Sequence, residues 1–140
     1  MINKLGIDLS GAKIDHIAYQ TSSSEEYNNL KLEFNKNAAL IREPEVGGRR
    51  VGVFKFNKPI VYKDEKINVI ELIEPKKDQN CISGLEHVEY LLPTTLEDFM
   101  QKYPNINWNT EALNREEFPM LILRLSENVQ VKFPRFPVIR

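Results

Sequence analysis

Short apolar or alternating stretches, separated by polar turns, follow one another along this chain in an order that occurs twice. In the first half, strands are predicted at 14–21, 38–42, 51–56 and 67–73. A helix is predicted between the first two of these strands, from Ser23 or Ser24 as its N-cap to Asn37. The glycines at 47–48 indicate a turn. The first half therefore predicts one strand, one helix and three further strands.

The second half repeats this order after a polar linker at 74–84. A strand is predicted at 85–92, and a helix at 96–103 that begins after Thr95 and ends at Pro104. Three extended segments follow, at 108–113, 120–125 and 129–133. The prediction is a single domain over 1–140 made of two βαβββ modules, at 12–74 and 84–137.

A short motif in the first strand of each half supports this duplication. Both strands have an acid, a histidine, a β-branched residue, any residue and a tyrosine, beginning at Asp15 and Glu86, 71 residues apart. The motif uses both histidines of the chain, His16 and His87. Because open solenoids need at least ~3 repeats to bury their faces, two modules are expected to pack as one closed unit.

The composition excludes several classes of protein. With 41% hydrophobic and 28% charged residues, the chain is neither disordered nor fibrous. Its 19 basic and 20 acidic residues give a net charge of -1, which argues against nucleic acid as a partner. The basic pairs Arg49-Arg50 and Lys76-Lys77 and the segment 133–137 are the features that a nucleic-acid or partner-binding role depends on, and such pairs usually form solvated faces.

The expected location is the cytoplasm. Cys81 is the single cysteine, so no internal disulfide can form, and a lone thiol is typical of a reducing compartment. Residues 1–10 have no apolar core of a signal peptide, and runs such as 120–123 are too short to span a membrane. No membrane association is therefore expected.

The two histidines and one glutamate suggest a metal site. The neighbours that alternation places beside His16 and His87 on their strands are mostly apolar or neutral, and Glu71 lies in an otherwise apolar strand, where an unpaired charge is costly. Two neutral imidazoles and a carboxylate suit one divalent ion (Zn, Mn, Ni, Co or Fe(II)) and leave positions for water or substrate.

Structural interpretations of the same residues stay open. Each histidine alone is typical of a hydrogen-bonded residue in or near the core. Glu71 has a potential ion-pair partner in Lys55 or Arg50 on another strand. Cys81 is a further potential ligand, but it lies in the polar linker.

At these residues the sequence resembles the vicinal oxygen chelate superfamily, which includes glyoxalase I, fosfomycin resistance proteins and extradiol dioxygenases. Within it, the chain is most similar to the YecM-type proteins, an uncharacterised bacterial family. The matching segments are 15–17, 48–49, 53–56, 70–72, 86–89, 92–93 and 131–133. The resemblance implies an α+β fold in which two βαβββ modules form a glyoxalase-like open barrel. It also implies metal ligands on the first and last strands of the modules, here His16, His87 and Glu71.

One position departs from the superfamily pattern. The fourth ligand, usually a glutamate on the last strand of the second module, falls on Lys132, and an ammonium group does not bind a metal. This substitution argues against glyoxalase activity, and the resemblance implies that lysine here is a feature of the YecM-type proteins. Lys132 has three open roles: a neutral amine acting as a base or nucleophile, a cation that binds an anionic substrate group, or an ion-pair partner of Glu71 or Glu89 that replaces the metal.

Two functions follow from the resemblance. The first is a metal-dependent enzyme, of a lyase, isomerase or dioxygenase-like type, that acts on a small molecule chelating the ion through two oxygens. Lys132 and Glu89 are its catalytic candidates, for proton transfer or anion binding. The alternative is a non-catalytic protein that binds a metal or small ligand on the same fold. Either a monomer or a homodimer is expected.

Overall fold

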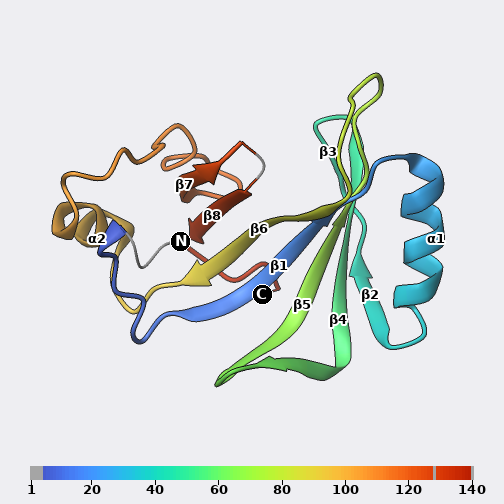
Figure 1. Cartoon of the computed structure of the whole chain (residues 1–140), viewed down its shortest axis with the longest axis horizontal. Helices are drawn as coiled ribbons and strands as arrows, with labels where there is room; N and C mark the ends of the chain where they lie inside the picture. Colours follow the sequence, from blue (N-terminus) through green and yellow to red (C-terminus); the bar gives the residue numbers. More distant parts are fainter. Residues whose placement is uncertain (1–4, 128, 140) are drawn as a thin grey trace. The chain divides into compact units, whose positions relative to one another are not determined.

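The computed structural model of the chain describes residues 5–127 and 129–139, and its regular elements are mostly strands (Figure 1). This mixture of helices and strands confirms the predicted α+β class. The elements are β1 (Lys13–Gln20), α1 (Ser24–Phe34), β2 (Ala38–Arg42), β3 (Glu45–Val46), β4 (Arg49–Tyr62), β5 (Glu65–Ile73), β6 (Gly84–Leu91), α2 (Leu96–Lys102), β7 (Met120–Ser126) and β8 (Val129–Pro134). Neither helix has the length and apolar character needed to cross a membrane in the part of the chain that is described.

The chain divides into two compact units, whose boundaries fall inside β1 and β6. One unit comprises residues 16–86, and the other comprises residues 1–15 together with 87–140. In the unit of residues 16–86, the strand order is β2-β4-β5-β1, with β1 parallel to β5 and the other pairs antiparallel. The short β3 pairs with the start of β4.

Helix α1 covers one face of this sheet (Figure 1). Ser23 caps the helix by accepting a hydrogen bond from the Glu26 backbone N–H, and the Glu26 carboxylate accepts one from the backbone N–H of Ser22, the residue before the cap. The helix ends at Phe34, three residues earlier than predicted, because Asn35 takes the C-cap position. Tyr27 is fully buried and packs in a cluster that includes Phe54.

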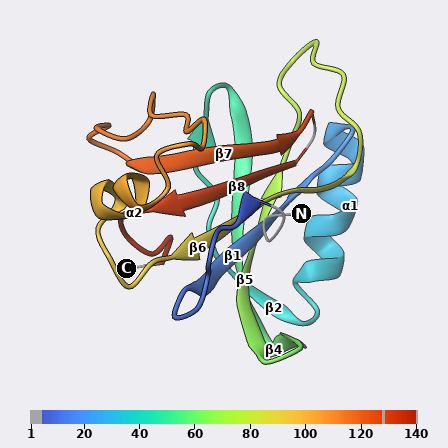
Figure 2. The same cartoon turned by 60° about the vertical axis from the view of Figure 1, so that its left-hand side comes forward.

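The other unit has the strand order β6-β8-β7, with β6 parallel to β8 and β8 antiparallel to β7, and the three strands lie side by side in Figure 2. Helix α2 begins after Thr95, whose hydroxyl accepts a hydrogen bond from the Asp98 backbone N–H. The core of this unit contains Phe99 from the helix and Phe133 from β8, whose ring centroids are 5.1 Å apart. This arrangement repeats that of β1, β5 and β4, as expected of a duplication.

One predicted strand of the second module is absent from the described residues. The segment 108–113 forms no strand: residues 111–113 are in a turn, and the segment contributes to the sheet one isolated bridge between Asn109 and Ile122 on β7. Its apolar residues still enter the core: Ala112 and Leu113 are buried, and Trp108 packs against Phe133. The second module is therefore βαββ with a single bridge where the first module has β2.

Candidate metal centre

His16 and Glu71 lie on neighbouring strands of the unit that comprises residues 16–86. His16 comes from β1 and Glu71 from β5, and in the parallel register Glu71 faces Ala18, two residues after the histidine. His16 Nε2 is 2.5 Å from Glu71 Oε1, with 2% of the histidine side chain and 14% of the glutamate side chain exposed. The predicted metal-ligating residues of the first module are thus in contact.

The face of the sheet that carries this pair is the face that α1 does not cover. Ile17 and Tyr19, on either side of Ala18 in β1, pack in the cluster under α1, so His16 and Ala18 point to the other side. Ala18 is fully buried there and packs with Val51 and Ile73. A rigid apolar strand environment therefore holds His16.

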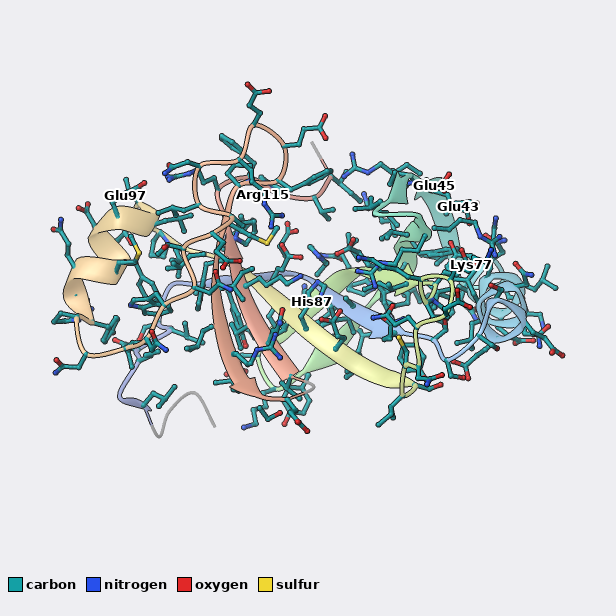
Figure 3. The ribbon with its side chains drawn as sticks, turned by 90° about the horizontal axis from the view of Figure 1, so that it is seen from above. Glu43, Glu45, Lys77, His87, Glu97 and Arg115 are labelled. Atoms are coloured by element: carbon teal, nitrogen blue, oxygen red, sulfur yellow. The ribbon has the colours of Figure 1, made fainter. Side chains whose placement is uncertain are left out.

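His87 and Glu89 form a second pair in the other unit, and both residues belong to β6. Figure 3 labels His87. They are two residues apart, so they share one face of the strand. His87 Nε2 is 3.1 Å from Glu89 Oε2, and both side chains are buried, with 4% and 7% exposed. Val88 and Tyr90 pack on the opposite side, against the core that contains Phe99 of α2.

The two modules differ in the strand that carries the carboxylate. In the first module, Glu71 on the last strand faces Ala18 on the first strand. In the second module, Lys132 on the last strand faces Glu89 on the first strand. The second module therefore has a carboxylate on its first strand, at Glu89, and a lysine at the position of its last strand that corresponds to Glu71.

Lys132 is half-buried and lies between Glu89 and Ile122 in the register of the sheet. The carboxylate of Glu89, which faces it, is in contact with His87.

The structural alternatives for Glu71 and Cys81 can also be compared with the structure. Arg50 pairs with Glu74 rather than Glu71, with Nη2 2.5 Å from Oε2, and the side chain of Lys55 is exposed. Cys81 is partly buried in the loop before β6. Arg50 is therefore engaged elsewhere, and the contact of Glu71 given above is with His16.

The two histidine–carboxylate pairs each have donors that suit a divalent transition metal. His16 and Glu71 in one unit, and His87 and Glu89 in the other, each offer one ligating atom, and all but Glu71 are buried. Two ligands of a tetrahedral ion at ~2.0–2.1 Å lie about 3.3 Å from each other, close to the 3.1 Å found between His87 and Glu89. The 2.5 Å approach of His16 to Glu71 would have to widen by less than about 1 Å. Imidazole and carboxylate together are suited to Zn, Mn, Fe, Co or Ni.

Sequence reasoning did not identify one further residue near this face, Arg49. It considered Arg49 and Arg50 as a solvated basic pair, whereas alternation along β4 sends the two side chains to opposite faces. Arg49 Nη1 is 3.5 Å from Oε1 of the buried Gln20 on β1. This contact joins two strands that are far apart in the sequence, so a local sequence pattern does not predict it.

Comparison with known proteins gives one family match. The family model described as "YecM protein" matches residues 1–135. An uncharacterised protein of Haemophilus influenzae is 27% identical over 105 residues, which are 75% of this chain and 55% of that protein. Protein YecM of Escherichia coli is 24% identical over 90 residues, which are 64% of this chain and 48% of that protein. The chain spans about half the length of these curated relatives.

Solved structures show the same fold. A structural-genomics protein, EC4020, has a TM-score of 0.77 and 22% identity, covering 97% of this chain and 78% of that one. A variant of methylmalonyl-CoA epimerase from Streptomyces coelicolor, in complex with 2-nitronate-propionyl-CoA, has a TM-score of 0.60 and 13% identity, covering 87% and 95%. Methylmalonyl-CoA epimerase in complex with methylmalonyl-CoA also has a TM-score of 0.60, at 13% identity and coverages of 88% and 93%. These likenesses confirm the predicted glyoxalase-like fold.

Proposed function

Because the chain belongs to the YecM family and has the glyoxalase-like fold of the vicinal oxygen chelate superfamily, we propose that it is a metal-dependent enzyme. Its substrate is a small molecule that binds the ion through two oxygens. The observation that carries this proposal is that the two histidines, at equivalent positions of β1 and β6, each contact a carboxylate.

We assign His16, Glu71, His87 and Glu89 as the ligands of one divalent ion. The assignment of His16, Glu71 and His87 follows the superfamily pattern, and Glu89 takes the place of the carboxylate that Lys132 cannot provide. A bound ion would act as a Lewis acid on the two substrate oxygens. Removing any of the four residues leaves buried polar groups without compensation, so each is expected to matter for both metal binding and stability.

Lys132 is then the candidate for proton transfer or for binding an anionic oxygen of the substrate. It faces Glu89 across β6 and β8, so it lies next to a proposed ligand without being one. A cationic ammonium at this position stabilises negative charge that develops on a substrate oxygen. With lysine at the position where glyoxalase I has a glutamate, glyoxalase activity is not part of the proposal.

The structural neighbours support a small oxygen-bearing ligand. The epimerase structures hold a CoA ester or its nitronate analogue, molecules with closely spaced oxygens. Their substrates are not assigned to this chain, because a sequence identity of 13% supports only a shared fold.

The test is elemental analysis of protein purified without a chelator or polyhistidine tag, together with thermal unfolding in the presence of each divalent ion. One ion per chain and a rise in Tm are expected for the wild-type protein, and both are expected to be lost in His16→Ala. Protein that contains no metal and whose Tm does not respond to any divalent ion would contradict the proposal. Mass analysis of a bound ligand before and after incubation separates an enzyme from a protein that binds without turnover.

A further inference from the structure

We propose that Arg49 binds an anionic group at the far end of the substrate, a carboxylate or a phosphate that is separate from the two metal-binding oxygens. This inference rests on the proposed function, because the near end of the substrate is taken to lie at the metal. It assigns a specificity-determining role to a residue outside the ligand set. Its evidence lies within the unit of residues 16–86.

Arg49 lies on the same face of the sheet as His16 and Glu71. Val51 faces Ile73 and Val53 faces Glu71 in the β4–β5 register, and Gln20 faces Ile73 in the β1–β5 register. Because alternate residues of a strand share a face, Arg49 continues the row that begins with Val53 and Val51. Its contact with Gln20, on the same face of β1 as His16, agrees with this placement.

The guanidinium of Arg49 is held but has capacity for a ligand. Nη1 approaches Gln20 Oε1 at 3.5 Å, a long contact, and Gln20 is itself fixed by hydrogen bonds from Nε2 to the carbonyls of Thr21 (3.0 Å) and Ile73 (3.4 Å). Nε is buried and has no hydrogen-bond partner among the described residues. A buried N–H without a partner is costly, and a carboxylate or phosphate is the usual bidentate partner of a guanidinium.

The neighbouring Arg50, in contrast, has a guanidinium group that is occupied by contacts within the fold. Its Nε and Nη2 donate to the two carboxylate oxygens of Glu74, at 3.2 and 2.5 Å, and its guanidinium lies 4.4 Å from the centre of the Tyr27 ring. Arg50 therefore stabilises the fold on the side of α1. Arg49 has no comparable set of partners within the described residues.

The position of Arg49 indicates how far from the proposed metal site the anionic group of the substrate would lie. The contact with Gln20 places the guanidinium near the row of Ile73, two residues along β5 from Glu71. A strand rises about 3.3 Å per residue, so the separation along the sheet is on the order of 7–10 Å. This distance is too long for a chelating oxygen and matches the second charged end of a molecule with a backbone of about five or six carbons.

The first experiment needs no metal. The Nε–H resonance of Arg49, assigned by its loss in Arg49→Lys, is followed by NMR while propionate or inorganic phosphate is added to the full chain. A saturable shift is expected, and the anion that saturates at the lower concentration identifies the end group as carboxylate or phosphate. A resonance that responds to neither anion, or only linearly as exposed arginines do, overturns the inference.

The second experiment uses the metal-loaded protein and two probes of equal length, 2-oxoadipate and 2-oxohexanoate, which differ in the distal carboxylate. Calorimetry is expected to show that the wild-type protein binds the diacid at least about tenfold more tightly. In Arg49→Gln this preference is expected to fall to within about twofold. Lys55→Gln is the matched control, because Lys55 lies on the same strand and, by alternation, the same face, and is exposed. It is expected to retain the preference.

The outcomes separate this inference from the proposed function. If no divalent ion binds, the proposed function fails, and the NMR titration still tests Arg49. If the metal binds but the preference for the diacid is absent, survives in Arg49→Gln, or is lost equally in Lys55→Gln, the role of Arg49 is wrong and the metal site stands.

Discussion

The carboxylate of the second module can be moved back to the last strand, and this exchange tests the assignment of Glu89 as a ligand. Glu89→Ala is expected to weaken metal binding, and adding Lys132→Glu is expected to restore it. The two positions face each other in the parallel register of β6 and β8. Neighbouring strands are about 4.8 Å apart, so a glutamate at 132 can direct its carboxylate to the point that Glu89 reaches.

The magnitude follows from the number of ligands. Losing one of four ligands is expected to raise the Kd for the metal by about 100-fold, which is about 2.7 kcal/mol. At a free ion concentration of about 1,000 times the wild-type Kd, the ion stabilises the fold by about 4.1 kcal/mol, whereas the variant gains about 1.4 kcal/mol. For a chain of 140 residues this difference corresponds to a Tm lower by roughly 10 °C.

Differential scanning fluorimetry with and without the ion measures this difference, and calorimetry gives the Kd directly. The metal-free Tm of each variant is measured as well, because Glu89 is buried and its removal also affects stability. Glu89→Ala combined with Lys132→Met is the matched control, since it removes the lysine charge without adding a carboxylate. If the double variant with glutamate at 132 binds metal no better than this control, Glu89 does not replace the missing ligand.

Three further predictions concern the fold around the site. Gly52→Ala is expected to destabilise the protein by about 1–3 kcal/mol in urea unfolding, because the new Cβ would lie 2.9 Å from the buried hydroxyl of Tyr27; no change would show that this contact relaxes freely. The hydrogen bonds from Arg50 lower the pKa of Glu74 from 4.5 to about 2, so this pair stabilises the fold above pH 4.5 and loses its effect as the pH falls toward 2. Glu74→Gln is therefore expected to cost about 2 kcal/mol at pH 7 and almost nothing at pH 2 in urea midpoints, and a pH-independent cost would contradict this origin. Ser23→Ala is expected to cost about 1 kcal/mol in the same assay because it removes the N-cap of α1, while a cost that Ser23→Asp does not recover would point to another cause.

Local patterns predicted most of the regular elements. The helix starts depend on Ser23 and Thr95, and both side chains form the expected cap hydrogen bonds. The strands that carry His16 and His87 were predicted within one or two residues of their observed bounds. These features depend on side chains a few residues apart, so the sequence contains the necessary information.

Predictions that depend on pairing between distant segments were less successful. The strand predicted to end at Phe56 continues to Tyr62, because a register shift between Lys55 and Ile60 accommodates Pro59. Trp108 and Leu113 made 108–113 resemble a strand, but their side chains enter the core from an irregular segment. Apolar content predicted that both residues pack, but not which backbone supports them.

The candidate site shows the same division. Alternation along β6 correctly places Glu89 on the face of His87, and the contact of Glu71 with His16 was expected from the superfamily pattern rather than from spacing. The facing of Glu89 and Lys132 was not predictable, because it depends on how β6 and β8 are aligned. The same limit applies to Arg49, whose contact with Gln20 joins two strands far apart in the sequence.

The single bridge between Asn109 and Ile122 has a consequence for how the second module tolerates changes in length. In the first module, β2 is tied to β4 by four residue pairs, so an insertion there would disturb the alignment of the sheet. The segment between α2 and β7 is joined to the sheet by that bridge, and a loop over the surface accepts inserted residues at little thermodynamic cost. Insertions and deletions among relatives are therefore expected to concentrate between Lys102 and Met120, where they leave His87, Glu89 and Lys132 in place.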